Sequence, residues 1–228
     1  MYSIAIDGPV SSGKSSVAEG VAKRLGILHL NTGELYRAIG YFAYKNKVAN
    51  VVDDQGMPQL SENDVAKLTQ ECEVGVEFID GKQHTFVNGE DVTKYLHTPL
   101  MSDYSSRVSV IPSVRDHVLD LQREIAKQQN VVMEGRDITS HVLPDSKYKF
   151  YITADAKVRA IRRQHENISK GIQTDFEQVL ADVELRDKRD MTRKVCPLVI
   201  VKDAIVIDTS NLEIDEVVQK IVSYVEEK

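Results

Sequence analysis

The chain has 228 residues, enough for one well-cored α/β domain or for a core domain that carries an inserted lobe. Its composition, 42% hydrophobic and 28% charged residues, is typical of a soluble globular protein, and no apolar run approaches the ~20 residues that a membrane helix needs. The formal net charge of −6 argues against a nucleic-acid polymer as partner, because proteins that bind one usually carry a basic excess.

The first predicted elements surround a glycine-rich loop. Residues 3–7 are predicted to form a short buried strand, and Ser16 to Leu25 a helix that ends at Gly26. The loop between them matches the phosphate-binding pattern G-x-x-x-x-G-K-[ST], in which backbone N–H groups and a helix N-terminus face one anion. In this pattern Lys14 would reach the β- and γ-phosphates, and the Ser15 hydroxyl would help to hold Mg²⁺. We therefore predict a nucleoside triphosphate site formed by Gly8, Pro9, Val10, Ser11, Ser12, Gly13, Lys14, Ser15 and Ser16.

Further along the chain, short apolar runs recur with helical segments between them. Continuous runs of this kind are typical of parallel strands that are buried on both faces and joined by helices. They predict a doubly wound α/β core of the P-loop NTPase type, whose ligands gather at the carboxyl ends of the strands. The runs are Ile4–Ile6, Ile27–Leu30, Val131–Met133, Phe150–Ile152 and Ala204–Ile207.

One segment departs from this pattern. Between Glu73 and Asp91 apolar and polar residues nearly alternate, and Asp80-Gly81 and Asn88-Gly89 readily supply the positive φ angles of type I′ turns. We predict hairpins of a small antiparallel sheet in an inserted lobe at about residues 58–97, with the core at 1–57 and 98–228.

Two arginines follow predicted strands. Arg37, next to Tyr36, suits a phosphate clamp beside a ring surface, although an exposed helix arginine is an equal alternative. Arg136 comes directly after a buried strand, where its planar fork can take a phosphate bidentately. Asp137 could orient that arginine or accept hydrogen bonds from a base, and a structural ion pair is the alternative.

Arginines also cluster on two predicted helices. Arg159, Arg162 and Arg163 share one side of a helix that begins near Asp155. Because like charges repel, a bound polyanion explains this cluster better than packing does, with a solvated face as the alternative.

On the helix that starts at Phe176, three charged residues continue the apolar stripe. Arg186, Asp190 and Arg193 fall close to the stripe at 100° per residue. Their position points them inward and favours a binding site over a solvated surface.

Asp53-Asp54-Gln55-Gly56 fits the D-x-x-G pattern of GTPases. The guanine-reading N-K-x-D run should follow downstream, but Asn46-Lys47 lies upstream and has no Asp two places on. We therefore set the GTPase interpretation aside.

Taken together, these residues resemble the bacterial cytidylate kinases, a family of nucleoside monophosphate kinases, from Ile4 to nearly the end of the chain. The phosphate loop combined with a β insert is far more specific than the loop alone. The resemblance implies phosphoryl transfer from ATP to CMP or dCMP with Mg²⁺, an inserted monophosphate-binding lobe and a short helical lid at about residues 155–172. The motifs that carry it are Ile6-Asp7-Gly8-Pro9 with the phosphate loop, Asn31-Thr32-Gly33-Glu34-Leu35-Tyr36-Arg37, Glu134-Gly135-Arg136-Asp137, Arg186-Asp187-Lys188-Arg189-Asp190, and Arg193 followed by Pro197-Leu198.

The resemblance also implies a role for each site residue. A carboxylate at Asp137 suits cytosine, because it accepts from the N4 amino group and would repel the carbonyl oxygen of uracil. In the implied site, Arg37, Arg136 and Arg193 hold the acceptor phosphate; Tyr36, Arg186 and Asp190 lie at its sugar; Ser106, Arg115 and Asp137 read the cytosine; and Arg159 and Arg163 join Lys14 at the triphosphate.

The chain departs from the family at Asn31, where Asp is usual, and at Ile138-Thr139-Ser140, where Met-Gly-Thr is common. The first departure should only modify local hydrogen bonds, whereas the second concerns the turn after the Arg136-Asp137 pair.

Several expectations about the chain as a whole complete the interpretation. Cys72 and Cys196 lack metal-ligand spacing and are expected to be free thiols. The chain enters its first strand directly, so we expect a cytoplasmic protein without a signal peptide or a membrane partner. We also expect a monomer, because no apolar stripe is left without a core role. Another small-molecule kinase, acting on UMP or on a non-nucleotide acceptor, and a regulatory nucleotide-binding module remain as alternatives.

Overall fold

The structure, a computed structural model, describes residues 1–48, 51–52 and 58–227. The Asp53–Gly56 segment lies outside the described residues. By packing, the chain forms two compact units, here called unit 1 (Met1–Leu30 with Gln128–Lys228) and unit 2 (Asn31–Lys127). Unit 1 holds the phosphate loop and unit 2 holds the predicted β insert; the bounds 58–97 for an inserted lobe stay a prediction.

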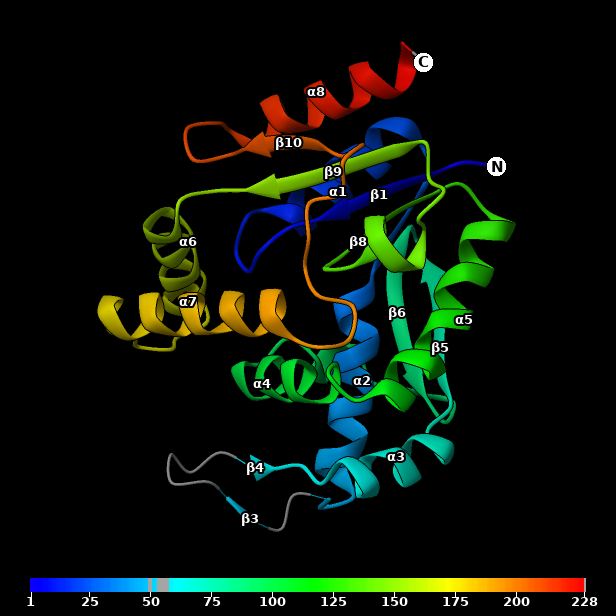
Figure 1. Ribbon diagram of the computed structural model, residues 1–228, viewed down its shortest axis with the longest axis vertical. Helices are drawn as coiled ribbons and strands as arrows, with labels where there is room; N and C mark the ends of the chain where they lie inside the picture. The colour runs from blue at the N-terminus through cyan, green and yellow to red at the C-terminus, as the bar shows by residue number, and fades with distance from the viewer. Residues whose placement is uncertain (49–50, 53–57, 228) are drawn as a thin grey trace. The chain divides into compact units, whose positions relative to one another are not determined.

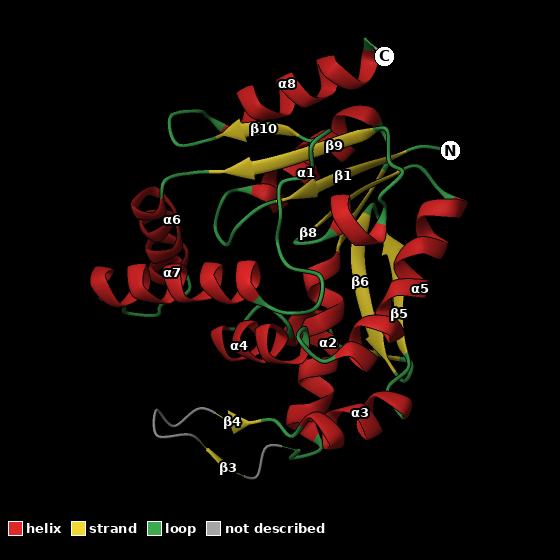
Figure 2. Ribbon diagram, viewed as in Figure 1, coloured by secondary structure: helices red, strands yellow, loops and turns green. Residues whose placement is uncertain are grey.

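Unit 1 is built on a five-stranded sheet in the order β10-β9-β1-β8-β2, with helices beside it (Figures 1 and 2). The pairs β1/β8, β1/β9 and β9/β10 are parallel. The five predicted apolar runs coincide with these strands, except that Ile27 and Ala204 lie one residue before β2 and β10, and the doubly wound parallel core is confirmed. The elements are β1 (Ser3–Asp7), α1 (Lys14–Leu25), β2 (Leu28–Asn31), β8 (Val131–Gly135), the π-helical turn η2 (Ile138–Val142), β9 (Tyr148–Thr153), α6 (Ala156–Ser169), α7 (Phe176–Thr192), β10 (Ile205–Asp208) and α8 (Ile214–Glu226).

The core of unit 1 explains the apolar runs of its central strands. Ile4, Ile6 and Ile152 on the central strands are fully buried, and Val21 of α1 and Ile221 of α8 pack into the same cluster. Each buried aliphatic side chain of this size contributes roughly 1.5–3 kcal/mol relative to an exposed one. The sheet is therefore a firm support for the loops that leave its carboxyl ends.

Unit 2 combines helices with small antiparallel sheets. Its main hydrophobic cluster includes Leu35 and Ile39, from the helix that follows β2, and Val114 and Val118, from the helix Pro112–Gln128. The elements are α2 (Thr32–Lys45), β3 (Val51–Val52), β4 (Pro58–Gln59), α3 (Glu62–Gln70), β5 (Val74–Ile79), β6 (Lys82–Val87), β7 (Glu90–Asp91), the 3₁₀ turn η1 (Thr93–Tyr95), α4 (Pro99–Val108) and α5 (Pro112–Gln128).

The predicted hairpins are present in unit 2. Strands β5, β6 and β7 form an antiparallel sheet in that order. Asp80 and Gly81 have φ of 52° and 75°, and Asn88 and Gly89 have φ of 50° and 80°. Positive φ at both central residues is the property of type I′ turns on which the prediction relied.

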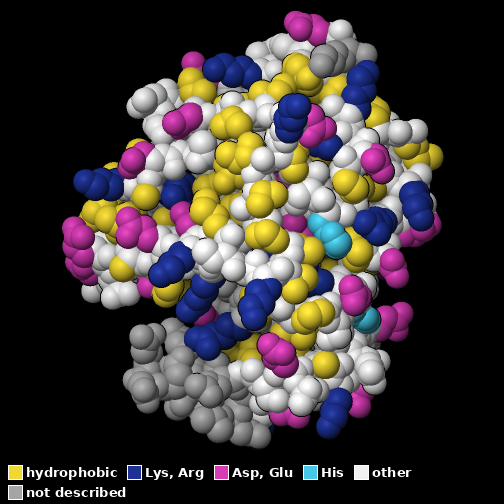
Figure 3. Space-filling view, in the orientation of Figure 1, with side chains coloured by type: hydrophobic (Ala, Val, Ile, Leu, Met, Phe, Trp, Pro, Cys, Tyr) yellow, Lys and Arg dark blue, Asp and Glu magenta, His cyan; other side chains and the backbone are white. Residues whose placement is uncertain are grey.

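The surface carries both signs of charge. On the face shown in Figure 3, Lys and Arg side chains are interspersed with Asp and Glu side chains. Among the described residues, no helix combines the length and the apolar character that crossing a bilayer requires. Cys72 and Cys196 are free thiols, as expected.

Candidate active site

The phosphate loop of unit 1 has the backbone that its glycines predict. A Cβ atom on Gly8 would lie 1.9 Å from the carbonyl oxygen of Ile152, so only glycine allows β9 to pass this close. Gly13 has φ of 89° and turns the chain into α1, which begins at Lys14 with no acidic residue in its first turn. The positive end of the helix therefore faces the loop, and the first turn of the helix itself adds no carboxylate.

Lys14 lies inside this loop. Its side chain is buried, and Nζ donates a hydrogen bond to the carbonyl oxygen of Pro9 at 2.8 Å. Burial and the nearby Arg136 guanidinium lower the pKa of Lys14 to about 7, against the charge of carboxylates such as Glu134. An anion bound in the loop would compensate this buried charge and favour the protonated amine.

Glu134 at the end of β8 is a second buried charge beside the loop. Burial alone would raise its pKa, but hydrogen bonds donated by His29 and by the Ser15 hydroxyl, together with the charge of Lys14, lower it to about 2. His29 Nε2 lies 3.5 Å from Glu134 Oε1. The carboxylate therefore stays ionised next to Ser15, and two oxygen donors of the kind that Mg²⁺ prefers lie together.

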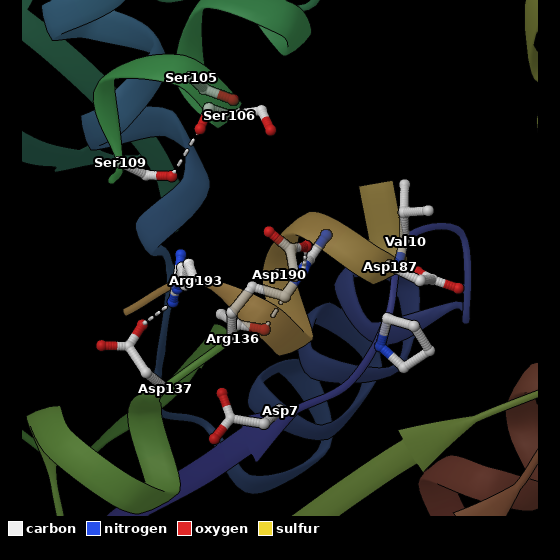
Figure 4. Close-up of polar contacts among 12 residues, drawn as sticks. Asp7, Val10, Ser105, Ser106, Ser109, Arg136, Asp137, Asp187, Asp190 and Arg193 are labelled. Atoms are coloured by element: carbon white, nitrogen blue, oxygen red, sulfur yellow. Dashed lines mark hydrogen bonds and ion pairs between the residues drawn. The ribbon is translucent and has the colours of Figure 1, made fainter. Parts of the chain in front are cut away.

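Arg136 and Asp190 form a charge pair across unit 1. The Nε of Arg136 lies 2.8 Å from Oδ2 of Asp190 on α7 (Figure 4). Burial raises the pKa of Asp190, but the charges of Arg136, Arg186 and Arg193 lower it below its usual range. The inward direction predicted for Asp190 is thus correct, because its side chain is buried among these arginines.

Arg193 is held at the C-terminal end of the same helix, three residues after Asp190. Its NH2 lies 3.4 Å from Oδ1 of Asp137 (Figure 4), and its Nε donates to the carbonyl oxygen of Cys196 at 2.7 Å. Cys196 has φ of 47°, and Leu198 N donates to Asp190 O at 2.8 Å. This turn after α7 brings Arg193 to Asp137, 56 residues away in the chain.

The turn after the Arg136-Asp137 pair is anchored by Asp7, which the sequence interpretation did not foresee. Both carboxylate oxygens accept backbone hydrogen bonds, from Ile138 N at 2.9 Å and Thr139 N at 2.7 Å. The Thr139 hydroxyl adds a third at 2.6 Å. Burial raises the pKa of Asp7 to about 6, although these hydrogen bonds lower it. The residues Ile138-Thr139-Ser140 therefore form a well-fixed π-helical turn.

Arg159 contacts the loop from helix α6. Its NH1 donates to Val10 O at 3.1 Å, its Nε to Ala154 O at 2.9 Å, and its NH2 lies 2.6 Å from Oδ2 of Asp187. Asp187 Oδ1 in turn accepts from Val10 N at 3.4 Å. Both polar groups of the Val10 backbone thus face one buried ion pair, whose acidic member was not among the predicted site residues.

The other two arginines of α6 also have protein partners. Arg162 donates to the hydroxyl and the carbonyl oxygen of Thr209 at 3.0 and 2.6 Å, and the Thr209 hydroxyl donates to Ser12 O at 3.1 Å. Arg163 pairs with Glu166 at 2.8 Å on the helix surface. A bound polyanion is therefore not needed to explain why these arginines cluster.

Unit 2 carries the remaining predicted residues. The Arg115 guanidinium lies over the Tyr36 ring, 5.4 Å from its centroid, and its NH1 donates to Ser109 O at 3.0 Å. Tyr36 and Arg115 are buried, whereas Arg37 and Ser106 are partly exposed. Ser106 O accepts from the Ser109 hydroxyl at 3.1 Å, as Figure 4 shows.

Comparisons with known proteins were made for the whole chain. The model of the family described as Cytidylate kinase matches residues 4–227. A cytidylate kinase of Caldicellulosiruptor bescii is 40% identical over 218 residues, which are 96% of this chain and 92% of the relative. A cytidylate kinase of Ligilactobacillus salivarius is 42% identical over 227 residues, 99% of this chain and 96% of the relative. The crystal structure of an uncharacterized protein from Eubacterium ventriosum shares the fold, with a TM-score of 0.53 at 15% identity, covering 100% of this chain and 99% of that one.

Proposed function

The chain belongs to the cytidylate kinase family, and from that premise we propose which of its residues carry out the phosphorylation of CMP and dCMP. The protein is a phosphotransferase, and its reaction yields CDP or dCDP. The donor is proposed to be ATP bound with Mg²⁺ at the phosphate loop. The observation that carries this proposal is the pairing in unit 1 of a phosphate loop with a buried arginine-carboxylate cluster around Asp190.

For the donor, we assign the triphosphate to the loop from Gly8 to Ser16. Lys14 would leave the carbonyl oxygen of Pro9 and donate to the β- and γ-phosphates. The Ser15 hydroxyl would hold Mg²⁺, with the Glu134 carboxylate beside it. No group of three or more His, Cys, Asp or Glu side chains that could hold a metal occurs among the described residues, which suits an ion bound mainly through nucleotide phosphates and water. When bound, Mg²⁺ neutralises charge that develops on the transferred phosphoryl group.

For the acceptor, the residues of unit 1 suit a phosphate and a polar base. Arg136 and Arg193 are proposed to hold the phosphate of CMP, because guanidinium groups bind phosphate bidentately. Asp137 is proposed to accept from the N4 amino group of cytosine, and Arg186 and Asp190 to bind the ribose. From unit 2, Arg37 would hold the same phosphate, Tyr36 would lie at the sugar, and Ser106 and Arg115 would read the cytosine.

Catalysis then needs no general base. The acceptor is a phosphate monoester that is largely dianionic near neutral pH, so its nucleophilic oxygen is already ionised. The arginines and Lys14 position the two anions in line and reduce their repulsion, which is how phosphoryl transfer is generally accelerated. Arg163 on the surface of α6 is proposed to join the triphosphate. Arg159 would act through the loop, since it hydrogen-bonds Val10 O.

A monomer that acts in the cytoplasm without a nucleic-acid or membrane partner stays a prediction. Size-exclusion chromatography with light scattering tests the oligomeric part, with an expected mass near the 25.6 kDa of one chain.

The experiment that tests the function is a coupled assay of ADP release with Mg-ATP. CMP, dCMP, UMP, AMP and shikimate are offered in parallel. We expect strong turnover with CMP and dCMP, weak turnover with UMP and none with AMP or shikimate. Without an acceptor, ADP formation should be slower by orders of magnitude. Equal ADP release with and without CMP would contradict the kinase assignment and favour a nucleotide-binding module.

A further inference from the structure

The antiparallel sheet of unit 2 makes a specific connection to the start of α2. The side-chain amide of Gln83 on β6 pairs with both backbone groups of Asn31: Asn31 N donates to Gln83 Oε1 at 2.7 Å, and Gln83 Nε2 donates to Asn31 O at 3.3 Å. Asn31 directly precedes α2 and gives that helix no side-chain cap. The amide of Gln83 thus provides an acceptor for the backbone N–H of Asn31, one of the N–H groups at a helix start that have no intrahelical acceptor.

A second contact from the same strand reaches one turn further. Gln83 Nε2 also donates to Thr85 Oγ1 at 3.1 Å, and the Thr85 hydroxyl donates to Glu34 Oε2 at 3.2 Å. Thr85 is fully buried and Glu34 is nearly so. The other carboxylate oxygen of Glu34 lies 3.3 Å from His97 Nε2.

These contacts come from one face of β6. Gln83 and Thr85 are two residues apart and so point to the same side of the strand. His84 between them pairs instead with Asp91, at 2.8 Å between Nδ1 and Oδ2, on the outer side of the sheet. Only one face of the strand therefore touches the segment that leads to Tyr36 and Arg37.

We propose that Gln83 and Thr85 are positioning residues, which fix the first turn of α2 so that Arg37 is held ready for the CMP phosphate. This role rests on the proposed function, in which Arg37 binds that phosphate. Thr85 acts on Glu34, one helical turn before Arg37. The β insert then serves acceptor binding without any of these strand residues touching CMP, and it has no part in binding ATP.

The test uses steady-state kinetics of the full chain with KM measured separately for CMP and for ATP. Gln83→Leu and Thr85→Val remove the polar groups while nearly keeping the size of the side chains. Each is expected to raise KM for CMP about five- to tenfold, the effect of losing one or two hydrogen bonds, and to leave KM for ATP within about twofold. Thr85→Ser keeps the hydroxyl and should restore the KM of the unchanged protein.

His84→Ala is the matched control, because it changes the residue between the two on the opposite face of β6. Thermal unfolding of every variant shows whether the fold is retained. If His84→Ala raises KM for CMP as much as Gln83→Leu does, or if KM for ATP rises together with KM for CMP, β6 is merely structural and the proposal is wrong.

Arg37→Lys separates this proposal from the proposed function. If Gln83 acts through Arg37, Gln83→Leu should add little to KM for CMP in the Arg37→Lys background. If Arg37→Lys raises KM for CMP but Gln83→Leu alone does not, the positioning role is refuted and the proposed function stands. If Arg37→Lys leaves KM for CMP unchanged, the assignment of Arg37 fails and the positioning role fails with it.

Discussion

The ion pair between Arg159 and Asp187 allows a sharp test of how unit 1 supports its phosphate loop. The side chains are 7% and 13% exposed, and the pair is 2.6 Å long. Asp187→Ala would leave the Arg159 guanidinium buried without its carboxylate, a change that typically costs about 3–5 kcal/mol. Because Arg159 keeps its hydrogen bonds to Ala154 O and Val10 O, we expect the lower end, about 3 kcal/mol. For a chain of this size, that corresponds to a fall in Tm of about 6–12 °C.

The assay is thermal and urea-induced unfolding of the full chain without nucleotide. Glu166→Ala is the matched control, since Glu166 pairs with Arg163 on the same helix at 2.8 Å but in a much more exposed setting. Exposed pairs are worth about 0–1 kcal/mol, so this variant should unfold close to the unchanged protein. The double variant Arg159→Met/Asp187→Leu should recover much of the lost stability, because it removes both charges together.

The kinetic consequence follows from Val10, whose backbone N–H and carbonyl both face this pair. Asp187→Ala should raise KM for ATP, because the loop loses one of its supports. If Asp187→Ala lowers the free energy of unfolding no more than Glu166→Ala does, the reasoning is refuted. Burial would then not increase the contribution of an ion pair to stability.

Three further predictions concern the reaction itself. Lys14→Met should lower kcat at least ~10²–10³-fold, the usual effect of removing one donor to developing charge, and near-normal turnover would remove Lys14 from the mechanism. Asp137→Asn should reduce the preference for CMP over UMP in the ADP-release assay, because an amide can also donate to the carbonyl oxygen of uracil; an unchanged ratio would show that another group reads the base. Chelation of Mg²⁺ with excess EDTA should abolish transfer, and added Mg²⁺ should restore it; full activity in EDTA would argue against the role given to Ser15.

Much of the fold could be predicted because local signals and tertiary structure agree. The continuous apolar runs became the parallel strands, and the central strands β1, β8 and β9 are buried on both faces. The two turns of the β insert followed from Asp-Gly and Asn-Gly, whose conformational freedom is a local property. Asp187 was missed although a signal was present: it continues the buried positions Val179 and Val183 at a spacing of four.

Other features of the site could not be found from the sequence, because they depend on residues that meet only after folding. Gln83 and Asn31 are 52 positions apart, and Asp7 and Thr139 are 132 apart. Neither contact leaves a periodic pattern, and a single sequence carries no information on which distant residues pair. The departure at residues 138–140 is visible in the sequence, but the conformation of that turn depends on Asp7, which accepts hydrogen bonds from its backbone.

The arginines of α6 show how folding separates residues that look equivalent in sequence. Arg159 and Arg163 share one face of a basic helix, and the sequence assigns both to the triphosphate. In the folded chain the Arg159 guanidinium donates to Val10 O and Ala154 O and pairs with Asp187. Moving Arg159 to a nucleotide would therefore break a buried ion pair. Arg163 would give up only an exposed pair with Glu166, which costs little. We therefore propose that Arg163 is the arginine that moves to the γ-phosphate, while Arg159 holds the backbone of the proposed phosphate loop at Val10.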